Sequence, residues 1–149
     1  HANHARGEPE ESQRRQATVL ETVAESLRLD ARNPVAFALR DTDAAGFGVY
    51  EHDGTEKAGA EGLSRAFAPL QAFLGTPEGL ESELVVVNDT ASELTADLSW
   101  QAGDDEGATE LTVDGRDRWT GGPIDLPAEA EVRLELSAAD YTVENRYVR

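Results

Sequence analysis

The chain of 149 residues contains no cysteine and no methionine, and Lys57 is its only lysine. Without cysteine, a disulfide framework, a thiolate-bound zinc or iron–sulfur site and a cysteine nucleophile are all excluded. The longest wholly apolar run, from Val35 to Leu39, is far shorter than the roughly 20 residues of a membrane-spanning helix. The first residues show no apolar segment typical of a secretory signal, so we expect a cytoplasmic location.

Positive charge is scarce, because 13 Lys and Arg residues stand against 30 Asp and Glu residues and the net charge is −17. Such a chain repels phosphates and anionic lipids, so neither nucleic acid nor a membrane is an expected partner. Acidic residues are interspersed with periodic apolar residues, which favours a folded protein over a disordered one. This composition resembles that of halophilic archaeal proteins, so we expect a high-salt cytoplasm and a fold that salt stabilises by screening.

Up to about residue 77, the pattern indicates helix, strand and helix. Apolar residues at three- and four-residue spacing predict a helix that Ser12 caps and that ends before Asn33-Pro34. The run Val35–Leu39 is short and bounded by turn residues, as in a strand that is buried on both faces. A second helix is expected from Ala58 to Leu74, with a kink or restart at Pro69.

From residue 78 onward, short strands and turn signals alternate. Leu84–Val87 is a continuous apolar strand, Leu94–Trp100 alternates apolar and polar residues, and two further strands lie around Val132–Leu136 and Tyr141–Tyr147. The expected turns or breaks are Gly103–Gly107, Asp114-Gly115 and Gly121–Pro123. This pattern predicts an antiparallel β-sandwich of about six or seven strands at most.

The chain is therefore expected to be of α+β class, with a boundary near Pro77. A single strand that needs cover on both faces does not make a domain with two helices. Residues 1–77 instead have the pattern of the last turns of a (β/α)8 barrel, and residues 78–149 that of an immunoglobulin-like sandwich. Because His1 is not an initiator methionine, we expect a processed chain or a piece of a longer one.

Three motifs follow one another in the first half: Ala36-Phe37-Ala38-Leu39-Arg40-Asp41, Gly48-Val49-Tyr50-Glu51-His52-Asp53-Gly54-Thr55-Glu56-Lys57 and Arg65-Ala66-Phe67-Ala68-Pro69. Their order and spacing resemble the end of the catalytic barrel of family-two glycoside hydrolases, especially the β-mannosidase-like members. In this resemblance, Asp41 is the aspartate that follows the last barrel strand and Lys57 is the lysine of the next segment. Residues 84–100 resemble the opening strands of the family's C-terminal immunoglobulin-like domain. Two departures are Arg40 in place of an asparagine, and Thr42-Asp43-Ala44 in place of a tryptophan that helps line a sugar subsite.

The resemblance implies a parent enzyme that hydrolyses β-glycosides, such as β-mannosides, with two carboxylates. Both catalytic glutamates of the family lie on earlier barrel strands, so we expect no catalytic residue in this chain and a structural role for it. No cofactor is expected. The expected partners are the rest of the parent barrel or a second copy of the chain, and a carbohydrate. The alternative hypothesis is a non-catalytic β-sandwich module for binding or interaction, with a helical appendage.

Three residues are candidates for substrate contact. Asp41 and Asp43 follow a buried strand, where barrel active sites collect side chains, although either could simply cap a turn. Trp119 lies in a glycine-rich stretch and could offer a ring to a sugar, whereas Trp100 closes an inward-facing set and is expected in the core.

No metal site is expected. His1 and His4 lie at a terminus that is expected to fray, and the acidic run Asp104–Glu106 lacks the alternate-residue spacing of calcium ligands. The triplet Asn88-Asp89-Thr90 is an N-glycosylation sequon, but it is explained equally well as a turn that ends a strand.

Overall fold

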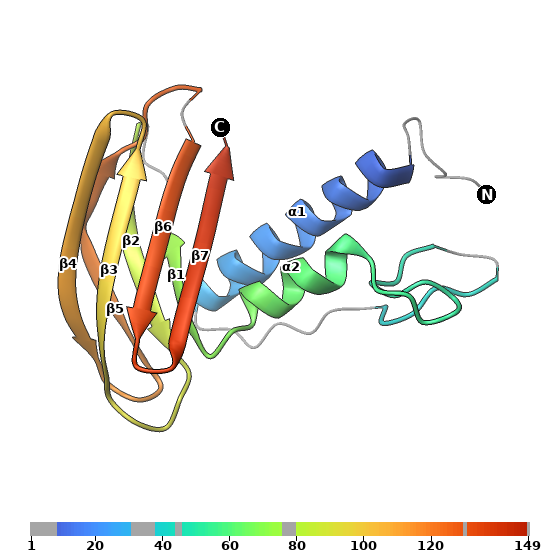
Figure 1. The fold of residues 1–149 in the computed structure, drawn as a ribbon, viewed down its shortest axis with the longest axis horizontal. Coiled ribbons are helices and arrows are strands. Elements are labelled where there is room, and N and C mark those ends of the chain that lie inside the picture. Colours follow the sequence, from blue (N-terminus) through green and yellow to red (C-terminus); the bar gives the residue numbers. More distant parts are fainter. Residues whose placement is uncertain (1–8, 31–37, 44–45, 76–79, 130, 149) are drawn as a thin grey trace. The chain divides into compact units, whose positions relative to one another are not determined.

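The structure, a computed structural model, describes residues 9–30, 38–43, 46–75, 80–129 and 131–148. Within them lie two helices and seven strands (Figure 1). The chain divides into two compact units, His1–Phe67 and Ala68–Arg149. This division lies ahead of the boundary that the sequence predicts near Pro77. Neither helix among the described residues has the length and apolar character needed to cross a membrane.

The first unit contains helices α1 (Pro9–Leu29) and α2 (Ala58–Ala66). Helix α1 begins before Ser12, so the expected cap lies inside the helix. Proline is favoured in a first helical turn, where its missing N–H costs no hydrogen bond, and the acidic Glu10 and Glu11 that follow it complement the helix dipole.

Small residues let α1 and α2 pack closely. A Cβ atom on Gly62 would lie 3.4 Å from the carbonyl oxygen of Ala17, and one on Gly59 would lie 3.2 Å from Leu20 Cδ1. The apolar core between them is correspondingly small, and its buried members are mostly alanine. They are Ala24, Val49, Ala60, Leu63 and Ala66.

Polar contacts also join the two helices. Arg65 donates from Nε to Glu21 at 3.1 Å, and Arg28 donates to the carbonyl oxygen of Ala66, at the end of α2. A buried arginine at this place satisfies a carbonyl group that the helix leaves without a partner and complements the negative end of its dipole.

The expectation that α2 continues to Leu74 is wrong. The helix ends at Ala66, and Leu70–Leu74 form strand β1, which pairs antiparallel with the next strand. Pro69 lacks an N–H group and disfavours the helical conformation in the residue before it. The apolar residues of 70–74 fit both helical and strand spacing, so the pairing partner decides the structure.

The second unit is an antiparallel sandwich, as the sequence predicts. The remaining strands are β2 (Glu81–Asn88), β3 (Leu94–Ala102), β4 (Asp105–Val113), β5 (Asp117–Asp125), β6 (Glu131–Ala138) and β7 (Tyr141–Val148). One sheet has the order β1-β2-β5 and the other the order β4-β3-β6-β7 (Figure 1). Its core joins buried aliphatic residues of both sheets, including Leu70, Val86, Leu98, Leu111 and Leu134.

Two of the expected turns are partly wrong. Residues Gly121–Pro123 lie within β5, where the register against β2 shifts between Glu83 and Val85. A bulge or irregularity of this kind, on an edge strand, is where a Gly-Gly-Pro sequence can be accommodated in a sheet. Strand β4 already begins at Asp105, so the connection between β3 and β4 is shorter than the sequence predicts.

Two asparagine side chains connect the sheets. At the end of β2, Asn88 is fully buried and donates from Nδ2 to the carbonyl oxygens of Ser92, Val113 and Asp114 at 2.9, 3.1 and 3.1 Å. On β7, Asn145 is 4% exposed and donates to the carbonyl oxygen of Ala72 on β1 at 2.6 Å. The bonds to Val113 and to Ala72 each join strands of different sheets.

Candidate functional site

The segment before α2 is folded back on itself by backbone hydrogen bonds. The amides of Val49 and Tyr50 donate to the carbonyl oxygen of Leu39 at 3.1 and 3.0 Å. The amide of Asp41 donates to Tyr50 at 2.9 Å, and the amide of Lys57 donates to Val49 at 3.0 Å. The start of α2 is thus fixed to the stretch Leu39–Asp41.

The side chain of Asp41 completes this arrangement. Its Oδ1 accepts a hydrogen bond from the Gly48 amide at 2.6 Å, and its Oδ2 accepts one from Lys57 Nζ at 2.8 Å. Both residues of the ion pair are buried, at 8% and 7% exposure. Burial alone would raise the pKa of Asp41, but the bonds from Lys57 and Gly48 outweigh it and lower the pKa below its usual value.

Gly48 allows the close approach that this bond requires. A Cβ atom at that position would lie 2.4 Å from the carbonyl carbon of Arg40, which is backbone and cannot move aside cheaply. Since each carboxylate oxygen of Asp41 accepts a bond from within the protein, Asp41 holds the loop in place.

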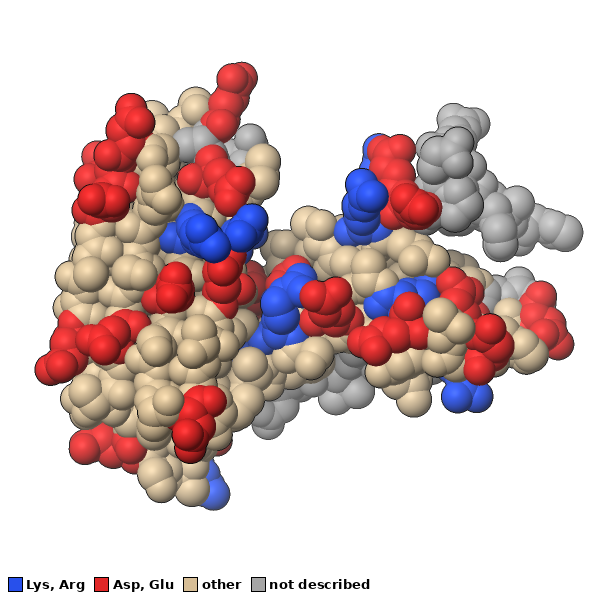
Figure 2. Space-filling view, viewed as in Figure 1, with Lys and Arg blue, Asp and Glu red and all other residues tan. Residues whose placement is uncertain are grey.

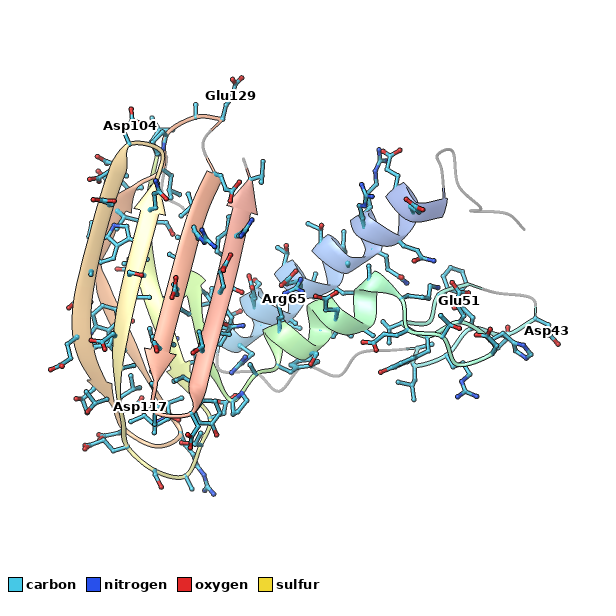
Figure 3. The ribbon with its side chains drawn as sticks, viewed as in Figure 1. Asp43, Glu51, Arg65, Asp104, Asp117 and Glu129 are labelled. Carbon is cyan, nitrogen blue, oxygen red and sulfur yellow. The ribbon has the colours of Figure 1, made fainter. Side chains whose placement is uncertain are left out.

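Asp43 is placed quite differently. Its side chain is 88% exposed, and its Oδ1 lies 3.2 Å from Nε2 of His52, itself 66% exposed. Figure 3 shows Asp43 at the outer end of the loop, pointing away from α1 and α2. An exposed carboxylate beside an imidazole can accept hydrogen bonds from a ligand, so the structure separates the two aspartates into a buried and an accessible one.

The expected buried strand falls mostly outside the described residues, which omit 31–37. At its described end, Leu39 is 71% exposed, and Phe47 on the same loop is 67% exposed. On α1, Val19 and Val23 are 61% and 50% exposed. The described part of the first unit thus presents large apolar side chains that are at least half exposed.

Trp119 lies on β5 and packs, half-buried, against the sandwich core. Its ring lies so close to Gly121 that a Cβ atom there would be 2.3 Å from it. Trp100 also packs half-buried against the core, with its ring against Gly107. In both cases the indole covers a glycine of the same sandwich. Trp119 therefore has less of its ring open to a ligand than a fully exposed tryptophan, and Trp100 is less buried than a core residue.

Among the described residues, the remaining sequence candidates do not form a site. No group of three His, Asp or Glu side chains among the described residues is arranged to hold a metal ion, and His1 and His4 lie outside those residues. In the sequon, the amide of Asn88 is buried and its Oδ1 accepts bonds from the amide and hydroxyl of Thr90, at 3.0 and 2.6 Å. This geometry is that of a turn.

Sequence reasoning did not find the contact between Asp41 and Lys57, nor the exposed ring of Phe47. The two charged residues are 16 positions apart, and no periodicity relates them. The only available signal was that the single lysine of a strongly acidic chain follows a loop that begins with an aspartate.

The chain has the fold of a segment found in two glycosidases. It superposes on a β-D-mannosidase from Dictyoglomus thermophilum with a TM-score of 0.81 at 14% sequence identity, over 92% of this chain and 19% of that one. It superposes on the exo-chitosanase CsxA from Amycolatopsis orientalis with a TM-score of 0.67 at 17% identity, over 91% of this chain and 18% of that one. No family model and no curated protein sequence matches the chain.

The chain thus spans about a fifth of the length of these enzymes. At such low identity the likeness concerns the fold, which includes both the helical unit and the sandwich because it extends over nine tenths of the chain. The motifs around Asp41 and Lys57 indicate a resemblance to family-two glycoside hydrolases, and the superpositions confirm this resemblance for the fold. The fold of the chain is that of the C-terminal part of family-two glycoside hydrolases.

Proposed function

We propose that the chain supplies the closing part of a β-glycoside hydrolase: the last strand, loop and helix of its catalytic barrel, and the immunoglobulin-like domain that follows. The observation that carries this proposal is the superposition of 92% of the chain on part of a β-mannosidase. The function of the parent enzyme is hydrolysis of β-glycosides in the cytoplasm, with β-mannosides as the first substrates to test. In this chain the role is structural.

The described part of the first unit supports this role because few of its apolar residues are buried. The buried apolar cluster among its described residues consists of five residues, three of them alanine. By contrast, Val19, Val23, Leu39 and Phe47 are at least half exposed. Neighbouring strands and helices of a barrel would cover such side chains, so the rest of the barrel is the partner that we propose, ahead of a second copy.

Within the barrel, we assign separate roles to the two aspartates. Asp41 is a positioning residue, which holds the loop against Gly48 and the start of α2 through Lys57. Asp43, exposed at the end of that loop, is the residue proposed to contact the sugar. Trp119 stays a weaker candidate for that contact, because its ring packs against the sandwich core.

The test is hydrolysis of aryl β-D-mannosides and β-D-glucosides in molar and in millimolar KCl. Retaining hydrolysis requires two carboxyls about 5–5.5 Å apart, and none are assigned to this chain, so the chain alone should give no turnover. Produced together with the polypeptide encoded immediately upstream, it should be active. Turnover by the chain alone, or upstream DNA that encodes no strand–helix repeats, contradicts the proposal.

In the active assembly, Asp43→Asn is expected to raise KM more than it lowers kcat, because it removes a contact to the sugar. Asp41→Asn is expected to lower kcat and to destabilise the chain, because it leaves the buried Lys57 without its carboxylate partner. If Asp43→Asn has no effect on either constant, Asp43 does not contact the substrate.

A further inference from the structure

His52 lies beside Asp43, the residue proposed to contact the sugar, and the proposed function gives it no role. Its Nε2 atom is 3.2 Å from Oδ1 of Asp43, which is the distance of a hydrogen bond between an imidazole N–H group and a carboxylate. The two residues belong to different arms of the loop, residues 38–43 and residues 46–57. The contact can therefore fix a side chain of one arm by means of the other.

The arm that carries His52 forms a turn closed by backbone hydrogen bonds. The amide of Glu51 donates to the carbonyl oxygen of Thr55 at 2.7 Å, and the amide of Gly54 donates to that of Glu51 at 2.9 Å. Gly54 has a φ angle of 94°, which glycine adopts without strain. Because His52 lies within this closed turn, the turn sets the direction in which its side chain leaves the backbone.

Helix α1 anchors the same arm. Gln13 donates from Nε2 to Oε1 of Glu51 at 3.0 Å, and Gln16 donates to two carbonyl groups of the arm at 3.1 and 3.3 Å. Figure 3 shows Glu51 nearer to the helices and Asp43 at the outer end of the loop. The residue that precedes His52 is thus tied to the helix.

The second carboxylate of this turn, Asp53, is engaged elsewhere. Its Oδ1 accepts a hydrogen bond from the amide of Thr55 at 2.9 Å. This bond is the main reason that the pKa of Asp53 lies below its usual value. Among the described residues, the ion-pair partner of His52 is therefore Asp43.

Asp43 has less support from its own arm. That arm is fixed at Asp41, whose amide donates to Tyr50 at 2.9 Å and whose carboxylate is held by Lys57. Asp43 lies beyond this point, and its side chain is 88% exposed. The contact with His52 thus joins an anchored imidazole to a carboxylate at the end of the arm, so that the imidazole positions the carboxylate.

The contact leaves one carboxylate oxygen open. An aspartate side chain has three staggered χ1 rotamers, and a hydrogen bond to one oxygen selects among them. With Oδ1 of Asp43 on the imidazole, Oδ2 can accept a hydrogen bond from a sugar hydroxyl. Holding the carboxylate in this orientation before the sugar arrives lowers the entropy cost of binding. Both the imidazolium and the neutral Nε2–H tautomer of His52 carry the proton that this requires.

We propose that His52 is a positioning residue that holds Asp43 in the orientation in which its second oxygen accepts a hydrogen bond from the substrate. This rests on the proposed function, in which Asp43 contacts the sugar. It extends that function by assigning the orientation of Asp43 to the turn around His52 and, through Gln13, to helix α1. His52 acts on binding and takes no part in bond cleavage.

The test in the active assembly is steady-state hydrolysis of the aryl β-glycoside that the assembly turns over. His52→Gln and His52→Asn form a matched pair, because the amide nitrogen of glutamine reaches the place of Nε2 whereas that of asparagine reaches only the place of Nδ1. We expect His52→Asn to raise KM about two- to fivefold, as for loss of an exposed charged pair, with little change in kcat. His52→Gln should restore most of that loss.

A double variant shows whether His52 acts through Asp43. In the Asp43→Asn background, His52→Asn should not raise KM further, because no carboxylate remains to be positioned. Glu56→Gln, exposed on the same arm, is the control and should leave KM unchanged. Equal KM values for His52→Asn and His52→Gln, or additive effects of Asp43→Asn and His52→Asn, would overturn the proposal.

A measurement on the full chain alone needs no glycosidase activity. Three-bond NMR couplings between the carboxyl carbon of Asp43 and its backbone nitrogen and carbonyl carbon report its χ1 rotamers. We expect one predominant rotamer in the unmodified chain and in His52→Gln, and averaged couplings in His52→Asn. Averaged couplings in the unmodified chain would contradict the positioning role even if the assembly is active. Single-rotamer couplings together with an inactive assembly would instead contradict the proposed function.

Discussion

At the scale of single residues, the buried pair of Asp41 and Lys57 makes the sharpest prediction. Lys57→Met removes the cation and leaves a buried carboxylate with one amide donor, which is expected to cost about 3–5 kcal/mol. The double variant Asp41→Asn/Lys57→Met should recover much of that loss, because no uncompensated charge remains. Denaturant unfolding followed by helical circular dichroism measures both, since the pair fixes the start of α2.

The control for this prediction is the exposed ion pair of Arg14 and Glu10, with side chains 76% and 86% exposed. Arg14→Met should cost less than about 1 kcal/mol, because solvent screens such a pair. If Lys57→Met and Arg14→Met destabilise the chain equally, the buried pair does not hold the loop. The single lysine offers a second readout, because amine labelling of Lys57 should be slow in the folded chain and fast in Asp41→Asn.

A second residue, Glu144, predicts how stability depends on pH. Hydrogen bonds from Arg133 and Arg146 lower the pKa of Glu144 from 4.5 to about 2. Because the folded-state pKa lies below the unfolded value, the stabilisation is complete above pH 4.5 and is lost as the pH falls towards 2. Glu144→Gln should therefore flatten the dependence of Tm on pH in this window. An unchanged slope in Glu144→Gln would contradict the assignment.

At the scale of secondary-structure elements, Asn145 joins strand β7 to strand β1 of the other sheet. Asn145→Ala leaves the carbonyl oxygen of Ala72 buried without its donor, which is expected to cost about 1–3 kcal/mol. Asn145→Asp should cost more, because a carboxylate then faces that carbonyl. Denaturant unfolding followed by tryptophan fluorescence measures the free energy of unfolding of each variant, because both tryptophans lie in the sandwich. A cost no greater than that of Thr142→Ala, an exposed position on β7, would show that the bond contributes nothing.

The strands of the sandwich show which elements could be predicted from the sequence and which could not. Strands β3 and β6 were predictable because their residues alternate between core and solvent, as Ala96 and Leu98 do against Asp97. Strand β1 was not, because Leu70 and Leu74 also fit one face of a helix and only the pairing with β2 separates the two structures. Likewise, the position of Asp41 at the start of a loop could be read from the sequence, but its pairing with Lys57 could not.

At the scale of the whole molecule, the net charge is −17, and acidic residues, red in Figure 2, are spread over the face that the figure shows. Self-repulsion of this size weakens as salt shortens the Debye length from about 30 Å at 0.01 M to about 3 Å at 1 M. We therefore expect Tm to rise by several degrees between 10 mM and 1 M KCl. A Tm that does not change over this range would contradict the expectation that salt stabilises this fold by screening its charges.

A single variant can separate screening of charges from a general effect of salt. Asp97 and Glu110 lie directly opposite each other on β3 and β4, and like charges in that relation destabilise a sheet. Asp97→Asn should raise Tm at 10 mM KCl and have little effect at 1 M, because screening has already removed the repulsion there. Asp140→Asn, on an exposed turn between β6 and β7, is the control and should shift Tm less at low salt. If Asp97→Asn gives the same shift at both salt concentrations, local contacts and not electrostatic repulsion limit the stability of this face.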